Sequence, residues 1–265
     1  AHRFASTMRE ALNIELLPFH EMESLVCGLQ FLHDSGPPDE VFIIGESGTE
    51  QPAEWPTPFF PCLIVNMGSG VSILRVDEGE DSMPLGRSFT RLGGTACGGA
   101  TFLGLARLMT SAVTFEEAIE MARRGDATRA NKLVGDIYGT EGCRHLGLPG
   151  TLTAAYFGKL MSVEGDVRAA TDEADTAAAL LLMVVQESVV LARAFSQLVN
   201  AQIGRSPPVF FVGGFLADNL QARGIIANSF LNLKLGPALF LRHADFLGAL
   251  GSVTQCVSGN PAKKK

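Results

Sequence analysis

The segment CLIVNMGSGVSILRV, residues 62–76, indicates more of the architecture than any other part of the chain. It consists of two strand-like runs, 62–67 and 71–76, joined by the turn Gly68-Ser69-Gly70. Two apolar runs rich in β-branched residues on either side of a short glycine turn are typical of a β-hairpin. We therefore expect a pair of strands here, with the glycine turn at their shared end.

Helices and strands are mixed along the rest of the chain. Apolar residues at helical spacing predict a helix over 20–33 and a long one over 171–200. Thr114 and Glu117 form a capping box in front of another helix. Further helices are expected over 100–108, after Asp126 and from about residue 245, and further strands over 41–44, 209–212 and 238–241. Such a mixture is typical of the α/β class.

The remaining segments are expected to be irregular. Four prolines predict a loop over 45–61, an acidic segment predicts a turn over 77–87, and glycines predict a loop over 93–99. Residues 252–265 resemble a frayed tail.

Composition excludes some classes of partner. The 265 residues include 21 Lys and Arg and 28 Asp and Glu, for a net charge of −7. Nucleic-acid and anionic-membrane surfaces need clustered positive charge, so we expect neither partner. The longest apolar run, 177–185, is much shorter than the roughly 20 residues of a membrane span and predicts a buried helix face. Five scattered cysteines favour free thiols in a cytoplasmic protein, without a zinc site.

Glycine pairs are the strongest local signal for a ligand. They stand at strand ends or helix starts and comprise Gly68 with Gly70, Gly93 with Gly94, Gly98 with Gly99, and Gly213 with Gly214. Glycine lets backbone N–H groups approach a phosphate closely, and a helix N-terminus favours an anion. None fits the P-loop pattern Gly-x4-Gly-Lys-Ser/Thr. Phosphate binding, with help from the Thr101 hydroxyl, and a set of ordinary turns are equally good interpretations at this point.

Two charged residues are candidates for chemistry. Arg91 precedes the second glycine group, where a guanidinium can hold a phosphate or carboxylate through two parallel hydrogen bonds. The alternative is a surface arginine without a role. Glu21 stands near the start of the 20–33 helix, where a carboxylate either accepts a proton from a substrate hydroxyl or merely complements the helix dipole.

A series of motifs occurs in an order that carries a family resemblance. They are VNMGSGVSIL at 65–74, RLGGT at 91–95, GGATFLGL at 98–105, FEEAIEMA at 115–122, KLV at 132–134, DIYG at 136–139, GLPG at 147–150, FVG at 211–213 and ALFL at 238–241. In this order the chain resembles the eukaryotic-type (type II) pantothenate kinases over about residues 21–251.

The resemblance implies a fold and an activity. The fold would be the actin-like ATPase (ribonuclease H-like) fold of acetate and sugar kinases, Hsp70 and actin, with a mixed sheet flanked by helices. The activity would be the phosphorylation of pantothenate by ATP and Mg²⁺, the first step of coenzyme A synthesis. Members of the family are homodimers, and many are inhibited by acetyl-CoA or another acyl-CoA.

The resemblance also assigns residues by position. Glu21 resembles the family's catalytic carboxylate, and Ser69, Ser72 and Arg91 resemble its substrate contacts. Arg91 would also stabilise charge on the transferring phosphoryl group. The implied nucleotide contacts are Gly68, Ser69, Gly70, Gly98, Gly99, Thr101, Gly213 and Gly214. No metal ligand is implied within this chain.

Some positions depart from the family pattern. Gly214 and Ala217 stand where the family usually has Asn and Arg, Asp245-Phe246 replaces a Gly-Tyr pair, and Thr151 replaces an aromatic residue. The family's first phosphate loop, of Asp-Gly-Gly-Thr type, should lie well upstream of Glu21, and residues 1–20 contain nothing that fits it. We therefore interpret residues 1–265 as the C-terminal portion of a kinase-like domain whose first half is incomplete.

Three functional hypotheses remain open from the sequence. The first is a pantothenate kinase, supported by the joint presence of Glu21, Ser69, Ser72 and Arg91. The second is a non-catalytic subunit that binds acyl-CoA or a kinase chain, supported by the missing phosphate loop. The third is a kinase of the same superfamily that acts on another small hydroxyl compound.

Overall fold

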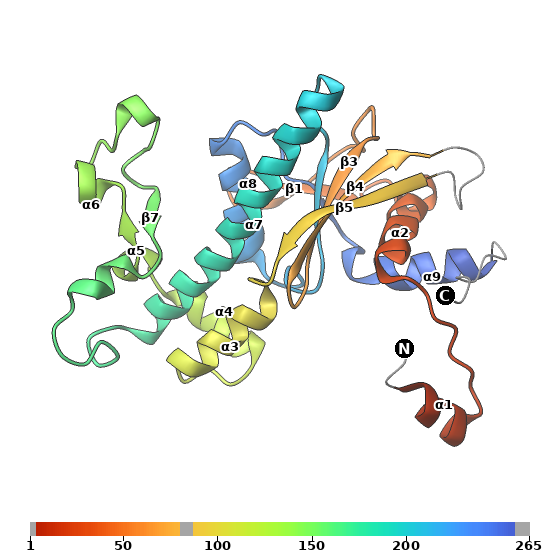
Figure 1. The fold of residues 1–265 in the computed structure, drawn as a ribbon, viewed down its shortest axis with the longest axis horizontal. Helices are drawn as coiled ribbons and strands as arrows, with labels where there is room; N and C mark the ends of the chain where they lie inside the picture. The colour runs from red at the N-terminus through yellow and green to blue at the C-terminus, as the bar shows by residue number, and fades with distance from the viewer. Residues whose placement is uncertain (1–3, 80–86, 258–265) are drawn as a thin grey trace.

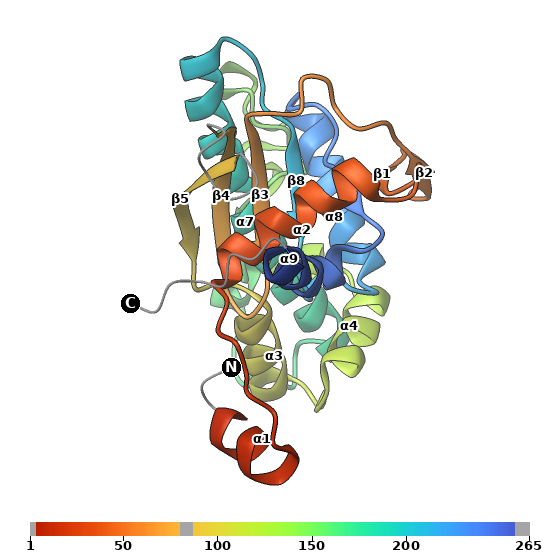
Figure 2. The same ribbon diagram turned by 90° about the vertical axis from the view of Figure 1, so that its right-hand side faces the viewer.

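The centre of the structure is the hairpin predicted from the glycine turn. In the computed structural model, which describes residues 4–79 and 87–257, β3 (Cys62–Met67) pairs antiparallel with β4 (Val71–Glu78). β5 (Arg87–Thr95) pairs antiparallel with β4, and β8 (Val209–Val212) pairs parallel with β3. The strand order is therefore β5-β4-β3-β8 (Figures 1 and 2).

A second sheet continues from β8. Phe210 of β8 forms a parallel bridge with Leu239, next to β9 (Phe240–Leu241). β9 pairs antiparallel with β1 (Val41–Ile44), and β1 pairs antiparallel with β2 (Glu50–Pro52). Three antiparallel strands followed by two parallel ones is the strand order of a ribonuclease H-like sheet. The predicted mixed sheet is thus confirmed by the topology of the chain itself.

Some of the helices begin at residues whose side chains accept hydrogen bonds from the first N–H groups of the helix. Thr114 and Glu117 form the expected capping box, and Asp126 and Asp172 accept hydrogen bonds from the backbone of Thr128 and Ala174. The remaining elements are α1 (Ala5–Leu12), α2 (Glu21–Ser35), α3 (Gly99–Met109), α4 (Phe115–Arg124), α5 (Ala127–Ala130), β6 (Lys132–Leu133), α6 (Gly135–Tyr138), β7 (Thr153–Ala155), α7 (Glu173–Ile203), α8 (Leu220–Asn232), α9 (Leu247–Val257) and three 3-10 turns (Arg144–Leu146, Gly158–Ser162 and Ala244–Phe246).

Helices cover both faces of the central sheet, as the view in Figure 2 shows. Leu63 and Val65 of β3 belong to one core, which they share with Val184 of α7. Ile64, whose side chain points to the opposite face, belongs to a second core with Leu29 of α2 and Leu247 of α9. Because β3 is buried on both faces, its sequence is an apolar run and does not alternate with polar residues.

The long helix α7 crosses one face of the sheet. The buried face predicted over 177–185 is confirmed, since most of that run is inaccessible to solvent. Among the described residues, α7 is the one helix that is long and apolar enough to cross a membrane. Half of its most apolar 18-residue stretch is buried inside the protein. That burial is what a core helix requires.

Some of the predicted loops are wrong. The predicted glycine loop over 93–99 is strand as far as Thr95, because glycine allows backbones to approach closely: a Cβ on Gly94 would lie 2.1 Å from the Val71 carbonyl oxygen. The predicted loop over 45–61 contains β2, which pairs with β1 despite its prolines. The acidic turn over 77–87 is narrower than expected, because β4 reaches Glu78 and β5 begins at Arg87; residues 80–86 lie outside the described part.

The predicted frayed tail is also wrong over 252–257. These residues form the last turns of α9, and Gln255 is buried where its amide donates to Ser24 of α2 at 3.2 Å. The helix expected from about residue 245 was predicted too short, because its last turns consist largely of small and polar residues and their packing partner, α2, is distant in sequence. Residues 258–265 lie outside the described part.

Helices α2 and α9 cross at two glycines. A Cβ on Gly28 of α2 would lie 2.1 Å from the Leu247 carbonyl oxygen, and one on Gly251 of α9 would lie 1.8 Å from the Ser24 carbonyl oxygen. Neither distance leaves room for a side chain. The glycines therefore set how closely α9 supports α2.

We expect Gly251→Ala to destabilise the protein by about 1–3 kcal/mol, because the added methyl group must push the two helix backbones apart. Differential scanning calorimetry would show this as a lower Tm. Gly248→Ala on the same helix is the control, since a Cβ there meets nothing within 4 Å. Equal melting temperatures for the two variants would contradict the tight crossing.

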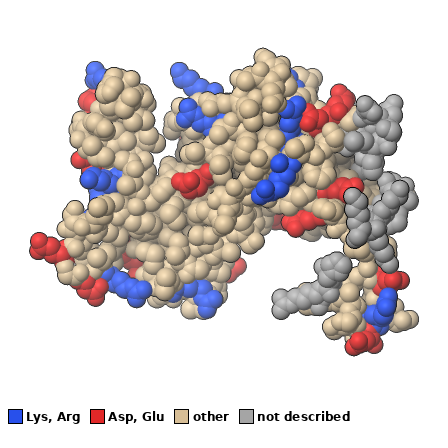
Figure 3. Space-filling view, in the orientation of Figure 1, with Lys and Arg blue, Asp and Glu red and all other residues tan. Residues whose placement is uncertain are grey.

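Two parts of the chain extend away from the sheet. The helix α1 has no buried residue and lies apart from the body, and the small β6–β7 sheet lies beyond one end of α7 (Figure 1). On the face shown in Figure 3, basic and acidic side chains are interspersed. That face therefore presents no basic patch of the kind that nucleic acid requires.

Candidate active site

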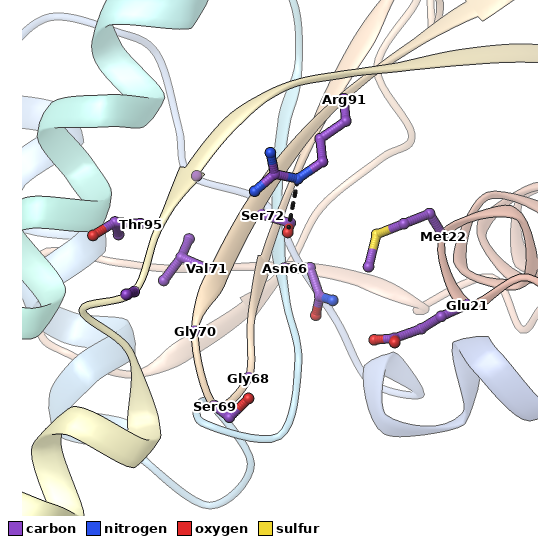
Figure 4. Close-up of a pocket in the computed structure, with 12 residues that line it drawn as sticks. Glu21, Met22, Asn66, Gly68, Ser69, Gly70, Val71, Ser72, Arg91 and Thr95 are labelled. Atoms are coloured by element: carbon purple, nitrogen blue, oxygen red, sulfur yellow. Dashed lines mark hydrogen bonds between the residues drawn. The ribbon is translucent and has the colours of Figure 1, made fainter. Parts of the chain in front are cut away.

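A cleft opens where the hairpin turn, the end of β5 and the start of α2 meet (Figure 4). Its volume is about 500 Å³. It is lined by Glu21, Met22, Asn66, Gly68, Ser69, Gly70, Val71, Ser72, Arg91, Gly94, Thr95 and Ala96. The structure thus brings together Glu21, Arg91, both predicted serines and the hairpin glycines, which come from four elements.

The face of the sheet that α2 covers changes from apolar to polar at this cleft. Ile64 is buried on that face of β3, and Asn66 is the next residue along it. Asn66 is paired with Ser72 of β4, so the two side chains share the face. Arg91 of β5 is paired with Leu74 of β4, and its side chain reaches Ser72. A ligand in the cleft would therefore lie along a line of polar side chains.

Glu21 lies across the cleft from this row. It is the first residue of α2, and its exposed carboxylate points toward Asn66 and the hairpin turn (Figure 4). The α2–α9 crossing holds the helix that carries it. A carboxylate at this place can accept a proton from a hydroxyl group of a ligand that the opposite wall holds.

Arg91 provides the positive charge of the cleft. Its Nε donates to Ser72 Oγ at 3.3 Å, which orients the guanidinium along the sheet face. The remaining N–H groups form a planar fork suited to a carboxylate or phosphate. A proton acceptor and an anion-binding group thus stand on opposite sides of one cleft.

The pair Gly98 and Gly99 has a structural role in this structure. The backbone N–H of Gly99 donates to the Gly68 carbonyl oxygen at 2.8 Å, and that of Ala100 donates to the Ser69 carbonyl oxygen at 3.0 Å. The Gly98 N–H donates to the Ala96 carbonyl oxygen at 3.1 Å. The first two of these bonds tie α3 to the hairpin turn, and all three donors are engaged within the protein. A phosphate cradle at this glycine pair stays a prediction.

The predicted Thr101 contact is likewise engaged within the chain. Its hydroxyl donates to the Ala96 carbonyl oxygen at 2.8 Å, and the residue does not line the cleft. Local hydrogen bonds already engage the groups that Gly98, Gly99 and Thr101 would offer to a nucleotide, and their role as nucleotide contacts stays a prediction.

The pair Gly213 and Gly214 follows the end of β8, beside the end of β3. Gly213 has a φ of +105°, a conformation that favours glycine. A Cβ there would lie 2.4 Å from the Met67 carbonyl oxygen and 2.6 Å from Asn66 Oδ1. Gly214 is exposed with open space around it. Neither residue lines the main cleft, but Gly213 adjoins its Asn66 wall; a contact of this pair with a nucleoside stays a prediction.

Several lining residues were not singled out from the sequence. Asn66, Met22 and Ala96 all face the cleft. Asn66 did give a signal, since it is the one polar residue in an otherwise apolar strand and comes two positions before the glycine turn. Met22 and Ala96 gave no such signal, because their place in the wall depends on tertiary packing.

The cysteines are free thiols in the structure. Burial, and to a smaller degree the charge of Glu23, raises the pKa of Cys27 to about 11. Burial also raises the pKa of Cys97. Both thiols are therefore protonated near neutral pH and are poor nucleophiles. Within residues 4–79 and 87–257, no group of three or more His, Cys, Asp and Glu side chains is placed to hold a metal ion.

Curated relatives of the chain are pantothenate kinases. It is 31% identical to a pantothenate kinase of Schizosaccharomyces pombe over 99% of this chain and 63% of that protein. It is 35% identical to pantothenate kinase 1 of Arabidopsis thaliana over 96% of this chain and 63% of that protein. It is also 35% identical to pantothenate kinase 2 of Oryza sativa over 95% of this chain and 26% of that protein. The chain thus spans at most 63% of the length of these relatives.

Solved structures are similar only at a distance. Component A of an Acidaminococcus fermentans (R)-2-hydroxyglutaryl-CoA dehydratase matches with a TM-score of 0.46 at 14% identity, covering 93% of this chain and 71% of that one. A Clostridium difficile activator of 2-hydroxyisocaproyl-CoA dehydratase, with bound ADPNP, matches with a TM-score of 0.45 at 13% identity. The match covers 91% of this chain and 67% of that one. The description of the fold therefore rests on the strand pairing of the chain itself and not on these matches.

The sequence profile of one family covers nearly the whole chain. The profile described as Fumble matches residues 1–255, which include every residue of the cleft, all of α2 and α9 as far as Gln255. The relatives and the collinear motifs are consistent with this match. The chain therefore belongs to the Fumble family.

Proposed function

We propose that the full-length protein containing this chain phosphorylates pantothenate at the expense of ATP. The observation that carries the proposal is the placement of the Glu21 carboxylate opposite the Arg91 guanidinium, across the glycine hairpin, in a chain of the Fumble family. Phosphoryl transfer depends mainly on positioning and on electrostatic stabilisation, and these residues can supply both.

The chemistry assigned to Glu21 is general-base catalysis. The primary hydroxyl of pantothenate gives its proton to the Glu21 carboxylate as its oxygen forms a bond to the γ-phosphorus of ATP. The bond from that phosphorus to the β,γ-bridging oxygen breaks, and ADP leaves with the electron pair. Protonated Glu21 then returns its proton to water.

Arg91 and Ser72 position the substrate. The guanidinium, oriented by its bond to Ser72, holds the carboxylate of pantothenate or stabilises negative charge on the transferring group. Ser69 at the tip of the hairpin adds a hydroxyl on the same side of the cleft. These interactions keep the reacting hydroxyl within reach of Glu21.

The described residues do not by themselves fit a complete site for MgATP. Glu21 is the one carboxylate among the residues that line the cleft, whereas Mg²⁺ is usually held by one or two carboxylates together with substrate phosphates and waters. The α3 amides are already bonded to the hairpin. We therefore assign no step to a metal ion on this chain. We expect the phosphate loop to be supplied from outside these 265 residues, either by the same polypeptide or by a partner polypeptide.

The finer features implied by the family resemblance complete the proposal. They are a homodimeric state, a cytoplasmic location, a role in coenzyme A synthesis and inhibition by an acyl-CoA that occupies the same cleft. The cleft's single arginine offers a phosphate or carboxylate site for such an inhibitor.

The proposal is tested by incubating the full-length protein with ATP, Mg²⁺ and pantothenate and following 4′-phosphopantothenate by mass spectrometry. Stoichiometric formation of ADP and 4′-phosphopantothenate is expected. Acetyl-CoA binding without turnover would support the alternative, a non-catalytic subunit. Turnover of a different small alcohol in place of pantothenate would support the third hypothesis.

A further inference from the structure

Asn66 is the polar exception in the innermost strand. The other residues of β3 are apolar and buried, whereas Asn66 is half-buried and lines the cleft. It lies on the face that α2 covers, opposite Ser72 and one residue beyond Val65. An Asn at this place lowers the apolar burial of the strand, so packing alone does not account for it.

The side chain has one end fixed by its surroundings. Its Oδ1 lies against Gly213, where a Cβ would approach it to 2.6 Å, and Gly213 is held at a φ of +105°. Its Nδ2 is therefore directed away from Gly213. Figure 4 shows the amide projecting into the space between Ser72 and Glu21. The group thus presents N–H donors to the middle of the cleft.

These donors are not used by the protein itself. Across residues 4–79 and 87–257, no side chain or backbone group forms a hydrogen bond with the Asn66 amide. Partial burial of an amide without a hydrogen-bond partner costs folding free energy unless a ligand or a water molecule completes its hydrogen bonds. The donors are consequently available at the point in the cleft that separates the base from the anion-binding pair.

We infer that Asn66 is a further substrate-contact residue, whose side-chain NH₂ donates a hydrogen bond to an oxygen of the molecule held between Glu21 and Arg91. The inference rests on the proposed function. In pantothenate, the acceptors between the reacting primary hydroxyl and the carboxylate are the secondary hydroxyl and the amide carbonyl. Asn66 accordingly recognises this hydroxy-amide portion, and it selects substrates that have an acceptor one to a few bonds from the reacting group.

The test compares Asn66→Asp and Asn66→Ala in the full-length protein. Asp has nearly the same shape but, when ionised, only accepts hydrogen bonds. We expect KM for pantothenate to rise about 2- to 10-fold in Asn66→Ala through loss of one neutral hydrogen bond. We expect a rise of about 10-fold or more in Asn66→Asp, which also faces a substrate oxygen with a negative charge. KM for ATP and the Tm should stay near the wild-type values.

The matched control is Asn228→Asp, the same change at an exposed position on α8 outside the cleft, and it should leave both KM values unchanged. Wild-type KM for pantothenate in Asn66→Asp would overturn the inference and leave the proposed function standing. Equal rises in KM for ATP and for pantothenate, together with a lower Tm, would also overturn the inference, because they would indicate that Asn66 has a structural role. A wild-type protein that does not phosphorylate pantothenate would remove the proposed function and the inference together.

Discussion

Replacing Glu21 by Gln is expected to lower kcat for pantothenate by about 100-fold or more, because the amide cannot accept the proton that the substrate hydroxyl releases. Glutamine has nearly the same size and shape, and Glu21 is exposed at the helix start, so folding and ATP binding should be preserved. Steady-state kinetics of the full-length protein, together with a thermal melt, would separate the two effects.

Glu23→Gln is the matched control for this substitution. Glu23 also lies in the first turn of α2 but does not line the cleft. Both changes remove one negative charge near the helix N-terminus, where a carboxylate contributes roughly 0.3–1 kcal/mol. If Glu21→Gln turned over pantothenate at the rate of the control, Glu21 would not be the base.

Replacing Arg91 by Ala is expected to weaken pantothenate and acetyl-CoA together, each by about 10- to 100-fold in Kd, which is the range for loss of hydrogen bonds to a charged group. The two ligands should respond in parallel because the cleft contains one arginine, at the same wall as Ser72. Isothermal titration of the full-length protein with each ligand would measure both constants.

Arg107→Ala provides the control for loss of positive charge, since Arg107 is exposed on α3 and does not line the cleft. The Kd values for pantothenate and for acetyl-CoA should both stay within about twofold of the wild-type values, as expected for a surface charge that salt screens. Loss of affinity for only one of the two ligands in Arg91→Ala would contradict a shared cleft.

The sequence predicted the parts of the site that local patterns determine. The hairpin of β3 and β4 follows from two apolar runs and a glycine turn, and this brings Ser69 and Ser72 close together whatever the rest of the chain does. The start of α2 at Glu21 follows from helical spacing. Assignment of Glu21 and Arg91 to one site came from the family resemblance, because nothing local relates a helix start to a strand 70 residues later.

The errors arose where glycine has more than one use. At Gly94 and Gly98 the absence of a Cβ allows close contact within the protein, whereas the same residues in sequence are equally compatible with a phosphate loop. Asn66 was passed over for a related reason. Its importance depends on Gly213, which lies far along the chain and becomes its neighbour only through the parallel pairing of β3 with β8.

The α2–α9 crossing has a consequence for synthesis on the ribosome. Ser24 and Ser252, which meet at this crossing, are 228 positions apart in sequence. At translation rates of about 5–20 residues per second, α9 is synthesised on the order of ten to fifty seconds after α2. Until then the apolar side of α2 has only part of its final cover and is a natural binding site for a chaperone. The helix that carries the proposed base is therefore synthesised long before α9 can complete its packing.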